Sequence, residues 1–230
     1  MFDLFGNSQP SQCSFQYPPS LFELYRPRTV AGFIGLADAK DFCEDLIENP
    51  KPSAWRFVGP SGTGKTTMAR ALAEMMPAEL HHIPSQECNL ETLERVCRTC
   101  QYVPAMGFKM HLILVDEADQ MSPAAQLYLL SKLDGTAQLP NTIWIFTCND
   151  TERLQDRFLS RTLPVTFSSY GIAAETSDLL ARVWDEQAPP SAELPNFARI
   201  VKDASNNVRA SLMALELKLT LARRRALKAA

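Results

Sequence analysis

The chain has 230 residues, of which 46% are hydrophobic and 21% are charged, a composition typical of globular proteins. This composition excludes a chain that is disordered, collagenous or coiled-coil over most of its length. The formal net charge of −3 excludes a wholly basic nucleic-acid or membrane-surface binder, so any DNA contact must come from a local patch. At roughly 150 residues per domain, the length predicts one domain or one and a half.

Residues 1–20 contain three Pro, three Gln, four Ser and no basic residue. Such a composition offers little to pack and predicts a flexible leader. No Lys or Arg precedes Arg26, and no run approaches 18 apolar residues, so we expect neither a secretory signal nor a transmembrane helix. The resulting expectation is a soluble, cytoplasmic protein.

Short apolar runs alternate with amphipathic stretches over residues 21–168. The runs are WRFV at 55–58, LILV at 112–115 and TIWIF at 142–146. Continuous apolar runs of this length are typical of parallel strands that are buried on both faces. We therefore predict an α/β core domain over 21–168, with a parallel sheet flanked by helices.

The strand pattern stops after Phe167. Helical periodicity follows at 171–187 and 196–228, and a Pro-containing segment separates the two stretches. We therefore predict a small all-helical lid domain over 169–230. Its last helix ends in basic residues. Their interaction with the helix dipole is the favoured explanation, and a DNA-binding tail is the alternative.

A phosphate-binding loop is predicted between the first apolar run and the helical stretch TTMARALAEMM. Residues 59–66, GPSGTGKT, match the pattern G-x-x-x-x-G-K-[ST]. In such a loop backbone N–H groups converge on phosphate oxygens, Lys65 neutralises the β and γ phosphates, and the Thr66 hydroxyl takes a Mg²⁺ position. The predicted nucleotide-binding residues are Gly59, Pro60, Ser61, Gly62, Thr63, Gly64, Lys65, Thr66 and Thr67.

Two adjacent carboxylates follow the apolar run LILV. Asp116 is suited to hold Mg²⁺ through water, and Glu117 to orient and deprotonate the water that attacks the γ-phosphate. Asn149 ends the next apolar run, where its amide could bind the γ-phosphate or that water, although Asn149-Asp150 also fits a plain turn. With the phosphate loop, the two acids indicate hydrolysis, and Lys65, Glu117 and Asn149 are the catalytic candidates.

Four segments carry a resemblance to a known family. They are LYRPRTVAGFIG at 24–35, GPSGTGKTT at 59–67, QYVPAMGFKMHLILVDEADQMS at 101–122 and FLSRTLPVTF at 158–167. In their order and spacing, the chain resembles AAA+ ATPases of the clamp-loader group, which includes replication factor C small subunits and bacterial γ/τ-type subunits. The resemblance implies a core and a lid with ATP and Mg²⁺ held between them, in a site that a neighbouring subunit completes.

The resemblance also implies roles for individual residues. Tyr25, Arg26 and Pro27 match the segment that lies along the adenine. Asn149 matches the family's sensor one, and Arg209 in NNVRASLMALE matches sensor two of the lid.

Arg161 matches the arginine finger that enters the next subunit's site, where a guanidinium neutralises charge on the γ-phosphoryl group in the transition state. Thr162 stands where the family commonly has Cys, and Arg157 is a second candidate one helical turn earlier. Arg161 is preferred because Phe167 falls six residues later, as in the family pattern. The alternative is that both arginines form surface ion pairs.

The implied function is that of a Mg²⁺-dependent ATPase subunit in DNA replication or repair, which uses ATP-driven assembly to act on a sliding clamp, DNA or both. Two alternatives stay open: a helicase loader or other AAA+ protein remodeller, and an ATP-binding structural adaptor of a larger replication assembly. Family members continue into a helical collar domain, whereas this sequence ends with the lid. We therefore expect its homo- or hetero-oligomers to depend on ATP-bridged core contacts or on other subunits.

The first five residues, MFDLF, resemble the short peptide with which many bacterial proteins dock into the sliding clamp. In that interpretation Phe2, Leu4 and Phe5 contact the clamp, and a self-docking latch or a merely hydrophobic start are the alternatives. For DNA, the candidate is Lys132, on a helix that would line the central channel in the family. A plain solvated lysine is the alternative there.

The six cysteines are unevenly spread through a chain that is large enough to fold without disulfides, so free thiols are expected. Cys88, Cys97 and Cys100 resemble the start of a zinc site, but the next position at that spacing is Val103. Cys97 and Cys100 also share the apolar face of one helix with Leu93, which favours core thiols. His81, His82 and His111 show no metal-ligand spacing.

Overall fold

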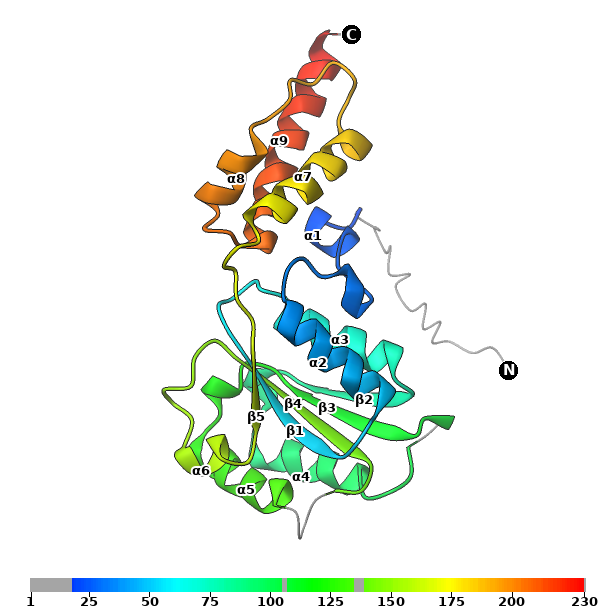
Figure 1. The fold of residues 1–230 in the computed structure, drawn as a ribbon, viewed down its shortest axis with the longest axis vertical. Coiled ribbons are helices and arrows are strands. Elements are labelled where there is room, and N and C mark those ends of the chain that lie inside the picture. The colour runs from blue at the N-terminus through cyan, green and yellow to red at the C-terminus, as the bar shows by residue number, and fades with distance from the viewer. Residues whose placement is uncertain (1–17, 105–106, 135–138, 230) are drawn as a thin grey trace, which may run out of the picture.

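The computed structural model describes residues 18–104, 107–134 and 139–229 of the chain (Figure 1). The candidate docking peptide with Phe2, Leu4 and Phe5 lies outside the described residues, as does Cys13. Within the described part of the chain, no helix is both long enough and apolar enough to cross a membrane.

A five-stranded parallel sheet lies at the centre of the core, in the spatial order β2-β3-β4-β1-β5. The strands are β1 (Ser53–Val58), β2 (Ala78–Ile83), β3 (Met110–Val115), β4 (Thr142–Cys148) and β5 (Leu163–Thr166). The three predicted apolar runs are β1, β3 and β4, the three central strands. Every residue of β3 and β4 is buried, because helices cover both faces of the sheet.

The two edge strands, β2 and β5, do not show as continuous apolar runs in the sequence. Each has one neighbouring strand and leaves apolar side chains in solvent, such as Leu80 on β2 and Leu163 on β5. A strand at the edge of the sheet need not be buried on both faces. Its residues are therefore not all apolar, and the continuous apolar run that predicts the central strands is absent.

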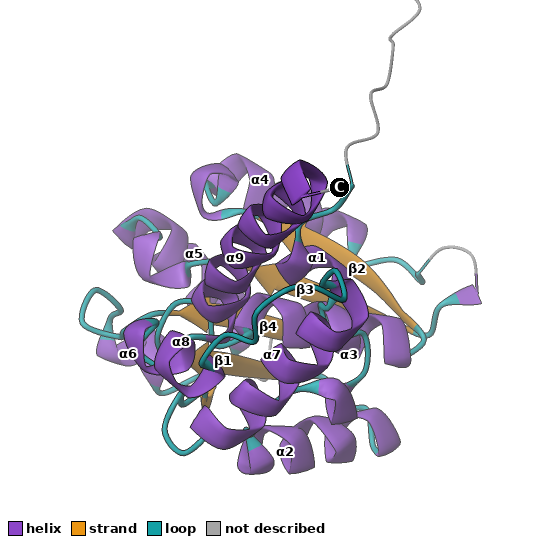
Figure 2. Cartoon of the chain, turned by 90° about the horizontal axis from the view of Figure 1, so that it is seen from above, coloured by secondary structure: helices purple, strands orange, loops and turns teal. Residues whose placement is uncertain are grey.

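Helices form a layer on each face of the sheet (Figures 1 and 2). α2 (Ala37–Glu48) and α3 (Lys65–Met75) cover one face, and α4 (Leu90–Thr99), α5 (Pro123–Leu133) and α6 (Asp156–Leu159) cover the other. Short 3₁₀ turns stand at η1 (Val30–Gly32), η2 (Ser85–Glu87) and η4 (Ala118–Gln120). Successive side chains of β3 point to opposite faces of the sheet. Leu112 and Leu114 pack in the apolar cluster on the side of α2 and α3, and Ile113 and Val115 pack in the cluster on the side of α4, α5 and α6.

The lid consists of α7 (Ala173–Gln187), α8 (Phe197–Asp203) and α9 (Val208–Ala229), which share an apolar core of their own. The periodic stretch 196–228 is therefore two helices. The chain breaks between α8 and α9 at Ser205 and Asn206, whose φ angles are 53° and 58°. Residues with this left-handed backbone conformation end a helix and change the direction of the chain. Asn adopts this conformation more readily than most residues.

The short helix α1 (Leu21–Leu24) packs on the lid, although its sequence position places it at the start of the core domain. Leu21 is buried among lid residues, and its backbone N–H donates to Glu216 Oε1 at 3.3 Å. The segment that follows α1 returns to the core, so residues 21–36 connect the two parts (Figure 1).

Phe146 lies in the apolar cluster on the sheet face that α4, α5 and α6 cover, and its packing there can be tested by mutation. It is fully buried on β4, stacks on Trp144 at a centroid distance of 5.7 Å and meets Phe158 edge-on at 4.9 Å. We expect Phe146→Ala to lower the free energy of unfolding by about 3–5 kcal/mol, because it leaves a cavity between packed rings. Urea unfolding measures this, with Tyr170→Ala as the control because Tyr170 is 92% exposed. Equal shifts in the two variants would contradict the packing argument.

Candidate nucleotide-binding site

The loop between β1 and α3 is held in a shape that depends on two glycines. At Gly59 a Cβ atom would lie 1.9 Å from the Phe167 carbonyl oxygen, so the loop passes too close to the end of β5 for a side chain. Gly62 has a φ of +80°, and a Cβ there would lie 2.4 Å from Asn207 Oδ1 of the lid. The glycines thus allow a close approach to both the sheet and the lid.

Lys65, the first residue of α3, points back into this loop. Its Nζ donates to the carbonyl oxygens of Gly59 (2.6 Å) and Pro60 (2.9 Å) and to Asn149 Oδ1 (3.1 Å). Burial lowers the pKa of the Lys65 ammonium, and the nearby Asp119 and Asp116 act in the opposite direction. The structure thereby brings together two of the predicted catalytic residues, Lys65 and Asn149.

The Asp116 carboxylate stands at the end of β3 and collects hydroxyl donors from two elements. Asp116 Oδ1 accepts from Thr66 Oγ1 and from Thr147 Oγ1, each at 2.7 Å. The predicted metal pair, Thr66 and Asp116, is therefore in direct contact. An all-oxygen set of one carboxylate and hydroxyl groups is the donor chemistry that Mg²⁺ prefers, so these residues fit that ion.

A histidine completes the surroundings of Asp116. His82 Nε2 lies 3.0 Å from Asp116 Oδ2, and Arg70 donates to His82 Nδ1 at 3.3 Å. Because the guanidinium can only donate, His82 Nδ1 is the acceptor and Nε2 carries the proton toward Asp116. The sequence signals neither His82 nor Thr147 as part of the site, since neither belongs to a recognised motif.

Glu117 has a left-handed backbone, with φ 49° and ψ 51°. Its N–H donates to Thr147 Oγ1 at 3.0 Å, and its carboxylate accepts from Ser85 Oγ at 3.1 Å. Such a conformation is costly for a residue with a side chain and persists only where contacts hold it. The effect here is to turn the Glu117 side chain toward the cavity beside the phosphate loop, which it lines with Lys65 and Asn149.

The lid supplies the other wall of that cavity. Arg209, on α9, lines it together with Lys65, Glu117 and Asn149, and its guanidinium also lies 5.8 Å from the ring centre of Phe22. Asn207 caps α9 by accepting from the Ala210 N–H at 3.0 Å, and its Nδ2 donates to the Ser61 carbonyl oxygen at 2.7 Å. Asn207 is thus a link between lid and phosphate loop that no sequence motif predicts.

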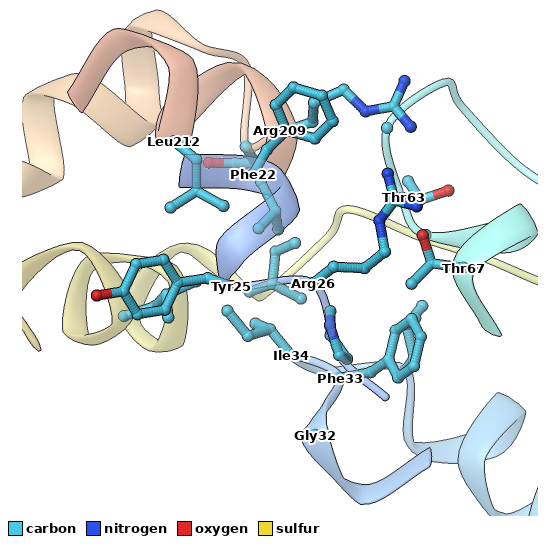
Figure 3. Close-up of a pocket in the computed structure, with 18 of the residues that line it drawn as sticks. Phe22, Tyr25, Arg26, Gly32, Phe33, Ile34, Thr63, Thr67, Arg209 and Leu212 are labelled. Atoms are coloured by element: carbon cyan, nitrogen blue, oxygen red, sulfur yellow. The ribbon is translucent and has the colours of Figure 1, made fainter. Parts of the chain in front are cut away.

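A second, largely apolar cavity adjoins the loop between α1, η1 and the lid (Figure 3). Arg26 points across it toward Thr63 and Thr67, whereas the Tyr25 hydroxyl points away and donates to Glu186 Oε2 at 2.5 Å. Pro27 also belongs to the lining. The apolar walls of this cavity include Phe22, Phe33, Ile34 and Leu212, none of which is among the binding residues predicted from the sequence. A largely apolar cavity with a few polar groups is chemically suited to a nucleobase.

Arg161 lies elsewhere, beyond the end of α6. Its guanidinium Nη2 pairs with Asp134 Oδ2 at 3.1 Å, and its Nη1 donates to the Arg157 carbonyl oxygen at 2.9 Å. Neither Arg161 nor Arg157 lines the two cavities around the phosphate loop. Thr162 beside it is buried, accepts from the Arg56 guanidinium and donates to the Phe158 carbonyl oxygen at 3.2 Å.

Two further predictions concern residues outside this site. Cys88, Cys97 and Cys100 are buried free thiols in one apolar cluster, and for Cys97 and Cys100 the helical spacing predicts this. The Lys132 ammonium nitrogen lies over the ring of Tyr128, 5.6 Å from its centre, so this lysine contacts a residue of its own helix, α5.

Comparisons with known proteins agree with this geometry. Residues 56–170 match the family described as ATPases associated with various cellular activities (AAA). Replication factor C small subunit 1 of Pyrobaculum islandicum is 32% identical over 154 residues, which are 64% of this chain and 46% of that protein. The replication factor C large subunit of Methanococcus aeolicus is 28% identical over 133 residues, 56% of this chain and 28% of that protein. The chain spans about half the length of the small subunits that it matches.

Among solved structures, the Holliday junction branch migration motor RuvB of Thermotoga maritima superposes with a TM-score of 0.65 at 17% identity, covering 84% of this chain and 64% of that one. This likeness shows the fold alone. The family match, by contrast, spans half of the chain and includes the end of β3 with its two acids, the end of β4 and β5. The chain therefore belongs to the AAA family of ATPases and is distantly related to replication factor C subunits.

Proposed function

We propose that this chain is an ATP-hydrolysing, Mg²⁺-dependent subunit of clamp-loader type, whose ATP-driven assembly acts on a sliding clamp, DNA or both. The observation that carries the proposal is the convergence of Lys65, Glu117, Asn149 and Arg209 on one cavity beside the phosphate loop. Three of these side chains come from the core and one from the lid, so the nucleotide would touch both parts. The clamp-loader role draws its support from the replication factor C relatives.

The proposed hydrolysis follows from the position of each group. Thr66 and Asp116 would hold Mg²⁺, which supplies charge neutralisation at the phosphates when bound. Lys65 would exchange the loop carbonyls for the β and γ phosphates. Glu117 would take the proton of the water whose oxygen attacks the γ-phosphorus, while the bond from that phosphorus to the bridging oxygen breaks and ADP leaves.

Arg161 would act on the site of a neighbouring subunit. It does not line the cavity of its own chain, and its partner Asp134 is a half-exposed residue that a neighbour's phosphate could replace. A guanidinium supplied in this way neutralises charge on the γ-phosphoryl group only when subunits are assembled, which would tie turnover to oligomer formation.

The first test separates binding from turnover. Lys65→Ala is expected to lose nucleotide binding, because it removes the cation in the loop. Glu117→Gln is expected to bind ATP normally and to lower kcat by about 10²–10⁴-fold, because an amide cannot take the proton. Equilibrium binding of a fluorescent ATP analogue and phosphate release measure the two effects, with Glu193→Gln on the lid surface as the matched control. Unchanged turnover in Glu117→Gln would remove the assignment of the base.

The second test addresses the trans arginine. Lys65→Ala and Arg161→Ala are each expected to be inactive alone, since a finger arginine contributes about 10³–10⁵-fold in kcat. A mixture of the two is expected to recover part of the activity, because Lys65→Ala subunits supply Arg161 to intact phosphate loops. Arg157→Ala alone is the control and should stay active, because it keeps both Lys65 and Arg161. If the mixture of Lys65→Ala and Arg161→Ala recovers no activity although both variants fold and assemble, the trans role of Arg161 is wrong.

The third test concerns the link between lid and loop. Asn207→Ala removes both the cap of α9 and the bond to Ser61, and is expected to lower the free energy of unfolding by about 0.5–2 kcal/mol. Asn207→Ser keeps a capping oxygen but loses the amide donor, so most of the stability should return. If the link to Ser61 also aids binding, ATP affinity should be weakened in both variants. Urea unfolding and nucleotide titration separate the two contributions, and identical unfolding of both variants would contradict the capping role.

A further inference from the structure

His81, Cys100 and His111 form a cluster at the edge of the sheet, away from the nucleotide cavity. Their ligand atoms all lie within 4.8 Å of one another. Cys100 and His111 are buried and His81 is half-buried. Imidazole nitrogens and a thiolate are the donors that Zn²⁺ favours in proteins.

The fold explains why this cluster is hidden in the sequence. β2 and β3 pair in parallel with Glu79 opposite His111 and His81 opposite Ile113, so His81 is the diagonal neighbour of His111. Both side chains share the sheet face of Ile83, Ile113 and Val115, on which α4 packs. Cys100 is the C-cap residue of α4.

The distances suit a tetrahedral ion. His81 Nε2 and His111 Nδ1 are 3.0 Å apart. Two nitrogens at a Zn–N distance of about 2.0–2.1 Å in tetrahedral geometry are roughly 3.3 Å apart, and a thiolate sulfur lies roughly 3.6 Å from each. The two rings therefore need to separate by only a few tenths of an ångström to admit the ion.

The tautomer of His111 is the one that a metal ligand needs, with the proton on Nε2 and none on Nδ1. His111 Nε2 lies 2.9 Å from the Tyr102 carbonyl oxygen, which only accepts, so Nε2 carries the proton and Nδ1 keeps its lone pair. A backbone carbonyl bound to the second ring nitrogen is the usual support of a zinc-binding histidine, because it fixes the tautomer and the ring plane.

A carboxylate and a route from solvent lie beside the cluster. Glu79 Oε2 lies 3.5 Å from His111 Nδ1, although Glu79 is not one of the three residues whose ligand atoms are all close together. Glu79, Tyr102 and His111 also line a surface cavity beside the end of α4, through which an ion could enter.

We propose that His81, Cys100 and His111 bind one Zn²⁺ ion, and that the Glu79 carboxylate turns toward the ion to become its fourth ligand. The ion would tie the end of α4 to β2 and β3. Binding releases the thiol proton of Cys100, and the ring proton of His81 moves from Nε2 to Nδ1, because the ligands are the thiolate and the unprotonated ring nitrogens. This ligand set differs from the Cys88, Cys97 and Cys100 pattern in the sequence, of which it uses only Cys100.

The test uses the full chain, freed of metal with a chelator and then titrated with Zn²⁺ and, separately, with Co²⁺. We expect one Zn²⁺ per chain after gel filtration, measured by mass spectrometry of the metal. Co²⁺ is expected to give the intense d–d bands of a tetrahedral ion and a thiolate charge-transfer band. Zn²⁺ is also expected to raise the melting temperature.

Three variants decide the ligand set. Cys100→Ser should lose the charge-transfer band and stoichiometric Zn²⁺, whereas Cys97→Ser, at a buried thiol of the same helix outside the cluster, should keep both. His81→Asn removes a half-buried ligand with little effect on the core, and should weaken Zn²⁺ at least tenfold while circular dichroism stays unchanged. The proposal is wrong if the unmodified chain binds neither ion, so that the cluster is only a hydrogen-bonded histidine pair. It is also wrong if Cys97→Ser and Cys100→Ser lose the ion equally.

Discussion

The carboxylate of Asp116 is the contact on which the arrangement of the site depends. It is a partly buried charge that accepts from Thr66 at the start of α3, from Thr147 on β4 and from His82 on β2. A buried charge is costly unless several donors satisfy it, and each donor here comes from a different element. The phosphate loop, the end of the sheet and the adjoining edge strand are therefore positioned by one group.

This arrangement also explains the position of Glu117. Thr147 donates its hydroxyl proton to Asp116 and accepts from the Glu117 N–H, so one side chain serves both acids. The left-handed backbone of Glu117 persists because Thr147 and Ser85 hold it from two sides. The left-handed backbone of Glu117 turns its carboxylate toward the cavity beside the phosphate loop, and in the proposed function this would separate the metal-holding acid from the acid that takes the proton of water.

The lid meets the core through short polar contacts and through α1. Asn207 holds the loop carbonyl of Ser61, and the backbone N–H of Gly35 donates to Glu175 Oε2 at 2.8 Å. These contacts are few and partly exposed, whereas the lid has its own buried cluster. Because the core and the lid each have a buried cluster of their own, a nucleotide that binds between them in the proposed function could change their relative orientation.

The sequence predicts those parts of the fold whose residue pattern follows from the structure of the same segment, such as a strand that is buried on both faces or a phosphate-binding loop. β1, β3 and β4 show as apolar runs because both of their faces are covered, and the phosphate loop shows because its glycines and Lys65 follow one another. The edge strands and the break at Ser205 and Asn206 are not predicted from the sequence. Their residue patterns depend on segments that are neighbours in space and not in the sequence. Asn207, Thr147 and the cluster around His111 are not predicted for the same reason: their partners lie 30 or more residues away or on another strand.

Thr162 shows how a departure from a family pattern can have a physical cause within the chain. The buried Arg56 on β1 donates to the Thr162 hydroxyl, and burial lowers the pKa of that guanidinium. A cysteine in place of Thr162 would offer sulfur, a weak acceptor, to a buried cation that needs a strong one. Because Thr162 also donates to the Phe158 carbonyl oxygen, the pair fastens the end of α6 to the sheet. Arg161 precedes this anchor directly, so its backbone is fixed while its side chain reaches the surface.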